Sequence, residues 1–106
     1  MPKYLYQVSY AAEGVKGLLK DGGSKRKAAA EALAKSVGGK VEAFYFAFGQ
    51  TDAYVIVDLP DNASAAAGAL VVSATGAISL KTTVLITPEE MDAAAKKSVT
   101  YSPPGK

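Results

Sequence analysis

Segments typical of β-strands alternate with segments typical of helices along this chain of 106 residues, and this order limits the possible folds more than any other feature. The strand-like segments are rich in Tyr, Val, Ile, Phe and Thr, which suit a half-buried pleated surface. The helical segments have apolar residues three and four positions apart, so these residues share one helix face. We predict strands at residues 3–10, 40–48, 52–59 and 78–86, and helices at residues 12–20, 25–37, 88–97 and between Pro60 and Gly76.

Capping residues mark where the predicted helices begin and end. Ser24 is the predicted N-cap of the second helix, and Gly38-Gly39 ends that helix. Asp61 or Asn62 caps the third helix. Residues 87–90 (TPEE) precede the last helix with the spacing of a capping box, and their proline suits the first helical position.

Each half of the chain has the order strand, helix, strand, and the short link Gly49-Gln50-Thr51 joins the two halves as a hairpin. Two such halves form the split βαβ, or ferredoxin-like, arrangement of the α+β class. Right-handed crossovers place the helices on one face of a four-stranded antiparallel sheet, with the first and third strands in its centre. We therefore predict one domain over residues 1–98, which includes a C-terminal helix, and an extended tail over residues 99–106.

The second and third predicted strands are apolar on both faces, whereas the helices can cover only one face of the sheet. Alternation along the second strand predicts one face with Phe44, Phe46 and Phe48 and another with Val41, Ala43, Tyr45 and Ala47. We expect the chain to associate with itself, as a homodimer or higher oligomer in which two sheets pack face to face. The alternative is that the last helix or the tail folds back over the uncovered face.

The chain contains no His, no Cys and no Trp. This composition excludes a histidine general base, a cysteine nucleophile, and the zinc, iron–sulfur and haem sites that use His or Cys ligands. Asp58 and Asp61 lack the further oxygen ligands that a magnesium or calcium site needs. We expect neither a metal nor a cofactor.

The formal net charge of +2 is small, and Lys25-Arg26-Lys27 is the one basic cluster in the sequence. No aromatic residue lies near this cluster along the chain, so we expect no nucleic-acid partner. No apolar run approaches the roughly 20 residues of a membrane-spanning helix, and the first residues lack the apolar core of a secretory signal. We therefore expect a cytoplasmic protein with no membrane partner.

Runs of residues along essentially the whole chain, among them 14–19 (GVKGLL), 23–26 (GSKR), 42–46 (EAFYF) and 80–85 (LKTTVL), resemble the GYD domain family. The Gly-Tyr-Asp signature of that family corresponds to Gly49, Thr51 and Asp52, with Thr51 in place of the usual tyrosine. No role of the signature tyrosine is therefore carried over. The resemblance implies a ferredoxin-like fold akin to the dimeric α/β barrel proteins, and a bacterial origin. It implies no established activity.

Gly23, Ser24, Lys25 and Arg26 form a candidate anion site, because the free N–H groups and the dipole at a helix start favour an anion. Lys and Arg in a first turn oppose the dipole, and a bound phosphate or carboxylate would offset this repulsion. The spacing does not match a P-loop. The alternative is that Ser24 caps the helix and the basic side chains are solvated.

Tyr54 and Lys81 are the candidate catalytic residues. Tyrosines on the strands could line a cleft for an aromatic substrate, and Lys81 could project into the sheet face as a buried amine. Alternatively, the tyrosines are core and interface residues, and Lys81 protects an edge strand from pairing. Our leading hypothesis is a homo-oligomeric domain that binds a small ligand or a partner without catalysis. The other hypothesis is a cofactor-independent oxygenase or isomerase of the dimeric α/β barrel type.

Overall fold

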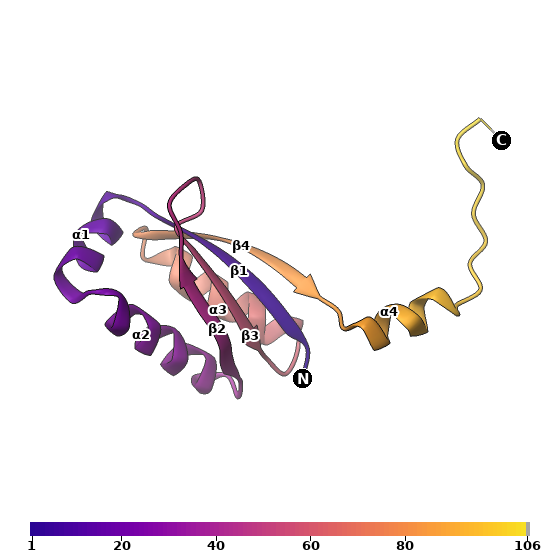
Figure 1. Ribbon diagram of the computed structural model, residues 1–106, viewed down its shortest axis with the longest axis horizontal. Helices are drawn as coiled ribbons and strands as arrows, with labels where there is room; N and C mark the ends of the chain where they lie inside the picture. Colours follow the sequence, from indigo (N-terminus) through magenta and orange to yellow (C-terminus); the bar gives the residue numbers. More distant parts are fainter. Residues whose placement is uncertain (106) are drawn as a thin grey trace.

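A computed structural model describes residues 1–105 of the chain, so Lys106, the last residue of the predicted tail, lies outside the described residues. The strands are β1 (Lys3–Tyr10), β2 (Lys40–Phe46), β3 (Ala53–Asp58) and β4 (Ile78–Leu85), and the helices are α1 (Ala12–Asp21), α2 (Gly23–Ser36), α3 (Asn62–Ala74) and α4 (Pro88–Ala95). The strands form one antiparallel sheet in the order β2-β3-β1-β4 (Figure 1). The predicted α+β ferredoxin-like fold is confirmed, with β1 and β3 in the centre.

The core lies between this sheet and the helices. Its strand residues are Tyr4, Tyr6 and Val8 of β1 and Ala53, Val55 and Val57 of β3, all of them buried. Along the sheet, α2 packs against β2 and α3 packs against β4. The two helices therefore lie over opposite edges of the same face, which we call the helix face (Figure 1).

No helix within residues 1–105 covers the opposite side of the sheet, which we call the open face. The side chains on this face include Ala43 and Tyr45 of β2, Tyr54 and Ile56 of β3, Leu5, Gln7 and Ser9 of β1, and Ser79, Lys81 and Thr83 of β4. The half formed by β2 and β3 is apolar except at the end that carries Glu42 and Asp58, whereas the half formed by β1 and β4 is mainly polar. Apolar residues on both faces of β2 and β3 agree with the sequence.

One residue of β2 lies on the face opposite to the predicted one. The pairing of β2 with β3 shifts between Val41 and Ala43, so that Val41 lies opposite Val57 and Phe44 lies opposite Val55. Val41 therefore belongs to the helix face, and its predicted place beside Ala43 and Tyr45 is wrong. The reason is a β-bulge, because one extra residue interrupts the strict alternation of side chains.

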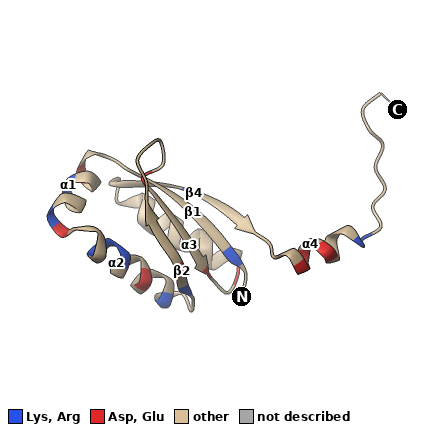
Figure 2. Cartoon of the chain, viewed as in Figure 1, with Lys and Arg blue, Asp and Glu red and all other residues tan. Residues whose placement is uncertain are grey.

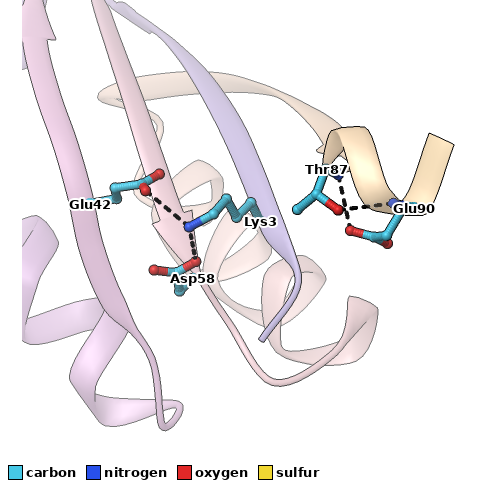
Figure 3. A network of polar contacts seen from close by, with 5 residues as sticks. All are labelled: Lys3, Glu42, Asp58, Thr87 and Glu90. Carbon is cyan, nitrogen blue, oxygen red and sulfur yellow. Dashed lines mark hydrogen bonds and ion pairs between the residues drawn. The ribbon is translucent and has the colours of Figure 1, made fainter. Parts of the chain in front are cut away.

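The predicted N-cap of α2 is also wrong. The helix begins at Gly23, before Ser24, and its N-cap is Gly22, which gives no side-chain hydrogen bond. Gly22 has a φ of 81° and its N–H donates to the carbonyl oxygen of Leu18, so one glycine both ends α1 and begins α2. The other predicted caps are confirmed: Asp61 accepts a hydrogen bond from the Ser64 N–H at 2.8 Å, and residues 87–90 contain a capping box (Figure 3).

Helix α4 projects away from the sheet, followed by an extended tail (Figure 1). All residues of α4 are exposed, and the described chain extends over 56 × 33 × 23 Å. Neither α4 nor the described part of the tail, residues 99–105, folds back over the open face, so this alternative is wrong. We call residues 88–105 the C-terminal arm. No helix within residues 1–105 is long and apolar enough to cross a membrane.

Candidate functional site

The candidate site is a cavity between the helix face of the sheet and the helices α2 and α3. Its volume is about 240 Å³. Val8, Val55 and Val57 of the central strands form part of its floor, and Phe44 and Leu80 contribute from the edge strands. The cavity is therefore lined mainly by aliphatic and aromatic side chains, as is usual for sites that bind small molecules.

The cavity exists because the helices present small residues to the sheet. Ala30 and Ala34 of α2 and Gly68 of α3 all line it. A Cβ atom added at Gly68 would lie 3.4 Å from the Tyr6 hydroxyl and 3.5 Å from Leu33, which is ordinary contact. Larger residues at these positions would occupy the space that the cavity leaves between the two helices.

Arg26 is the one charged residue among those that line the cavity in the described chain. It lies in the first turn of α2, and its Nε atom is buried with no hydrogen-bond partner. None of the ion pairs found within residues 1–105 involves Arg26. A buried donor without an acceptor is rare in folded proteins, because its lost hydration is not replaced.

Two tyrosines of β1 also line the cavity. The Tyr6 hydroxyl donates to the carbonyl oxygen of Ala65 at 2.7 Å, so its proton is already used within the fold. Burial, and then the neighbouring Tyr4, raise the pKa of Tyr6 above its ordinary value. Tyr10 lies at the far end of β1, where a second and more open hollow adjoins the cavity and shares Tyr10 and Arg26 with it.

The four residues of the predicted anion site do not face the same way. The ring of Phe46 lies against Gly23, where an added Cβ would come within 2.9 Å of it. Ser24 and Lys25 are exposed, whereas Arg26 is half-buried and lines the cavity. An anion site formed by all four residues remains a prediction.

The hairpin between β2 and β3 contains the signature residues Gly49 and Asp52. Asp52 accepts a hydrogen bond from the Tyr10 N–H at 2.8 Å through Oδ2, and its own N–H donates to the carbonyl oxygen of Val8 at 2.7 Å. Asp52 therefore ties the hairpin to the end of β1. Gly49 is exposed at the hairpin, and Thr51 is half-buried.

The model of the GYD domain family matches residues 4–95, which is most of the chain. The chain belongs to the GYD domain family. No curated protein and no solved structure matches it. The match confirms the resemblance, and it covers every strand and helix of this GYD domain except the first residue of β1.

The candidate catalytic residues Tyr54 and Lys81 lie away from the cavity, on the open face. Pairing places Tyr54 opposite Gln7 and Gln7 opposite Lys81, so the three residues form one row across β3, β1 and β4. Both candidates are exposed, and Lys81 lies on an edge strand. The structure thus brings them to the same row but separates them by one strand, and their catalytic role stays a prediction.

A polar cluster at the edge of the open face was not found from the sequence. The Lys3 amine lies 2.7 Å from Asp58 and 3.0 Å from Glu42 (Figure 3). The hydrogen bond to Asp58, and then the one to Glu42, raise the pKa of Lys3 above its ordinary value. These residues lie far apart in the sequence and share no motif, so no local signal could have revealed the cluster.

Within residues 1–105, no charged residue besides Arg26 lines the cavity itself, and Glu13 lines the adjoining hollow together with Arg26. Figure 2 shows basic and acidic residues interspersed along α1 and α2, and acidic residues near the start of α4. Within residues 1–105, no three side chains of His, Cys, Asp or Glu come together as a metal site would require. Arg26 is therefore the residue that distinguishes the cavity electrostatically.

Proposed function

We propose that this GYD domain is a self-associating binding module that holds a small, mainly apolar ligand in the cavity between α2, α3 and the sheet. The cavity is the observation that carries this proposal. Its volume of about 240 Å³ exceeds that of the engineered cavity of about 150 Å³ that binds benzene in another protein. The space is preformed between regular elements, so binding requires little rearrangement.

A neutral probe tests whether the cavity is a binding site. We expect 1-octanol to bind the protein, and Ala30→Leu to weaken this binding about tenfold or more, because the longer side chain fills the cavity. Ala32→Leu is the matched control, since Ala32 is exposed on the same helix and does not line the cavity. Titration calorimetry and amide chemical shifts measure the affinity and locate the probe.

Two results would contradict the cavity proposal. One is that 1-octanol does not bind, and the other is that the Ala30 variant binds it as tightly as the Ala32 variant does. If Ala30→Leu fails to fold, Gly68→Ala replaces it, because an added methyl group at Gly68 makes only ordinary contacts. The smaller Gly68→Ala change is expected to weaken binding without unfolding α3.

The open face supports the self-association part of the proposal. Tyr45 is 72% exposed and Tyr54 is 41% exposed, and both lie on the apolar half of that face beside Ile56. A second copy, related by a two-fold axis, presents the same apolar half and covers it without any further partner. Two sheets stacked in this way bury large apolar areas.

The exposed C-terminal arm also supports a second copy of this chain as the partner. Helix α4 has 8 residues, all exposed, and it includes Met91. Isolated helices shorter than about 12 residues are marginal in water even with good capping. A second copy that receives the arm supplies the packing that α4 lacks in the single chain, as in other exchanged segments.

A charge placed on the open face tests self-association. We expect Tyr45→Lys to shift the protein towards the monomer, because two copies would bring lysines into an apolar contact. Leu70→Lys is the matched control, since Leu70 is similarly exposed, at 71%, on α3 behind the sheet. Sedimentation velocity measures the assembly. A wild-type monomer, or dissociation by the Leu70 variant alone, would contradict the proposed interface.

A further inference from the structure

We infer that the ligand of the cavity is a monocarboxylate with an apolar body, and that Arg26 binds its carboxylate. This inference rests on the proposed function, because it names the class of ligand for the same cavity. It depends on one juxtaposition, in which a guanidinium group with an unpartnered, buried Nε borders a mainly apolar space.

The state of Arg26 calls for an anion. Arg26 is half-buried, and its buried Nε has lost hydration that a hydrogen bond would normally replace. Within residues 1–105 no ion pair to Arg26 is found, and its Nε has no acceptor. Arg26 also lies in the first turn of α2, where the helix dipole opposes a positive charge and favours a negative one beside it.

A carboxylate matches the geometry of the guanidinium group. The planar guanidinium presents parallel N–H groups, including Nε–H, that bind both oxygens of a carboxylate at once. The one charge at the cavity suits a monoanion. A phosphate monoester carries more charge and would require further cations, whereas Lys25 and Lys27 are exposed and do not line the cavity.

The rest of the cavity determines the other end of the ligand. The Tyr6 hydroxyl already donates to Ala65, so it is not free to donate to a ligand. Valine, leucine and phenylalanine side chains form most of the remaining lining, and Tyr10 and Ser64 are its only other residues with side-chain hydroxyls within residues 1–105. An aliphatic or aromatic body without polar substituents is therefore favoured, and a sugar or an amino acid is disfavoured because its polar groups would be buried without partners.

A pair of probes with the same chain length separates the carboxylate from the apolar body. We expect the wild-type protein to bind octanoate about tenfold more tightly than 1-octanol. Arg26→Gln should abolish this preference, because it weakens octanoate binding much more than 1-octanol binding. Lys27→Gln removes the same charge from an exposed neighbour and should retain the preference. Titration calorimetry at neutral pH and constant ionic strength measures all these affinities.

The outcomes distinguish this inference from the proposed function. Equal affinity of the wild-type protein for the two probes, or an equal effect of the two substitutions, would overturn the role of Arg26 while the cavity remained a binding site. Failure of both probes to bind would overturn the proposed function itself. If Arg26→Gln does not fold, Arg26→Lys tests the same point. It keeps the charge but loses the planar donors, so octanoate binding should weaken more than 1-octanol binding does.

Discussion

Two buried tyrosine hydroxyls anchor α3 to the sheet. The Tyr4 hydroxyl donates to Asn62 Oδ1 and the Tyr6 hydroxyl donates to the carbonyl oxygen of Ala65, each at 2.7 Å. Their rings fill the core, with 1% and 6% of their surfaces exposed. The ring of each tyrosine thus buries apolar surface, and its hydroxyl holds α3 in place through a hydrogen bond.

Removing the Tyr6 hydroxyl tests how much its hydrogen bond to α3 stabilises the fold. We expect Tyr6→Phe to lower the free energy of unfolding by about 1 kcal/mol, because a buried hydrogen bond is lost. Tyr45→Phe removes an exposed hydroxyl and should change stability much less. Urea denaturation at neutral pH measures both variants. An unchanged Tyr6→Phe protein would show that the hydroxyl does not stabilise the contact with α3.

The same residue predicts how stability changes at alkaline pH. The pKa of Tyr6 is raised above 10.0 in the folded protein by burial and then by Tyr4, so the unfolded chain releases this proton at a lower pH. The stability that Tyr6 contributes is therefore fully present below its pKa in the unfolded chain, and it declines as the pH rises through its pKa in the folded protein. We expect wild-type stability to fall more steeply than that of Tyr6→Phe between about pH 9 and pH 11. Parallel slopes would contradict this expectation.

The junction between α2 and β2 shows how two adjacent glycines serve different purposes. Gly38 has a φ of 86°, and the N–H groups of Gly38 and Gly39 donate to the carbonyl oxygens of Lys35 and Ala34, which is a Schellman motif. Gly39 instead allows a close approach, because a Cβ there would overlap with the carbonyl oxygen of Asp58. The sequence predicted that this pair ends the helix, but not the contact with β3.

The close approach makes Gly39 sensitive to substitution. We expect Gly39→Ala to lower the free energy of unfolding by about 1–3 kcal/mol, because the new methyl group displaces a central strand. Gly17→Ala, in the interior of α1 with no atom near the added Cβ, should instead raise it by up to about 1 kcal/mol. Thermal and urea denaturation of the two variants provide the comparison. Similar changes in stability from both substitutions would show that the close approach to Asp58 does not restrict the residue at position 39.

Two predictions about single elements failed because contacts between elements matter. Strict alternation placed Val41 on the wrong face, since a bulge depends on how β2 pairs with β3. Ser24 has the right chemistry for a cap, but Gly22 already turns the chain into α2. Within the predicted anion site, only the packing of α2 on the sheet could reveal that Arg26 turns inward.

The C-terminal arm makes the molecule elongated. The radius of gyration is 16.8 Å, whereas a compact domain of this length has one of about 13 Å. Met91, Val99 and Tyr101 are exposed along the arm. In the proposed assembly, these side chains pack against a second copy.

Removing the arm tests this assembly. A chain that ends at Thr87 should fold, because the core lies within the preceding elements. We expect its dimer to be weakened about tenfold or more, since the partner loses the contacts of α4. A chain that lacks only residues 99–106 separates the contribution of Val99 and Tyr101 from that of α4. Sedimentation velocity over a range of concentrations measures the affinities. Unchanged association of the shorter chain would show that the arm does not join the copies.

The helices, the strands and most of their ends can be predicted from the sequence, because they depend on interactions between residues close together along the chain. The order of strands and helices, the caps at Asp61 and Thr87, and the apolar residues on both faces of β2 and β3 depend on neighbours along the chain. These signals identified the α+β class, whereas the family was recognised from runs of residues that resemble the GYD domain. The cavity, the inward Arg26 and the Lys3 cluster depend on distances between α2, α3 and strands that are remote in sequence. Side-chain volume and packing set those distances, and no periodicity along a single segment contains them.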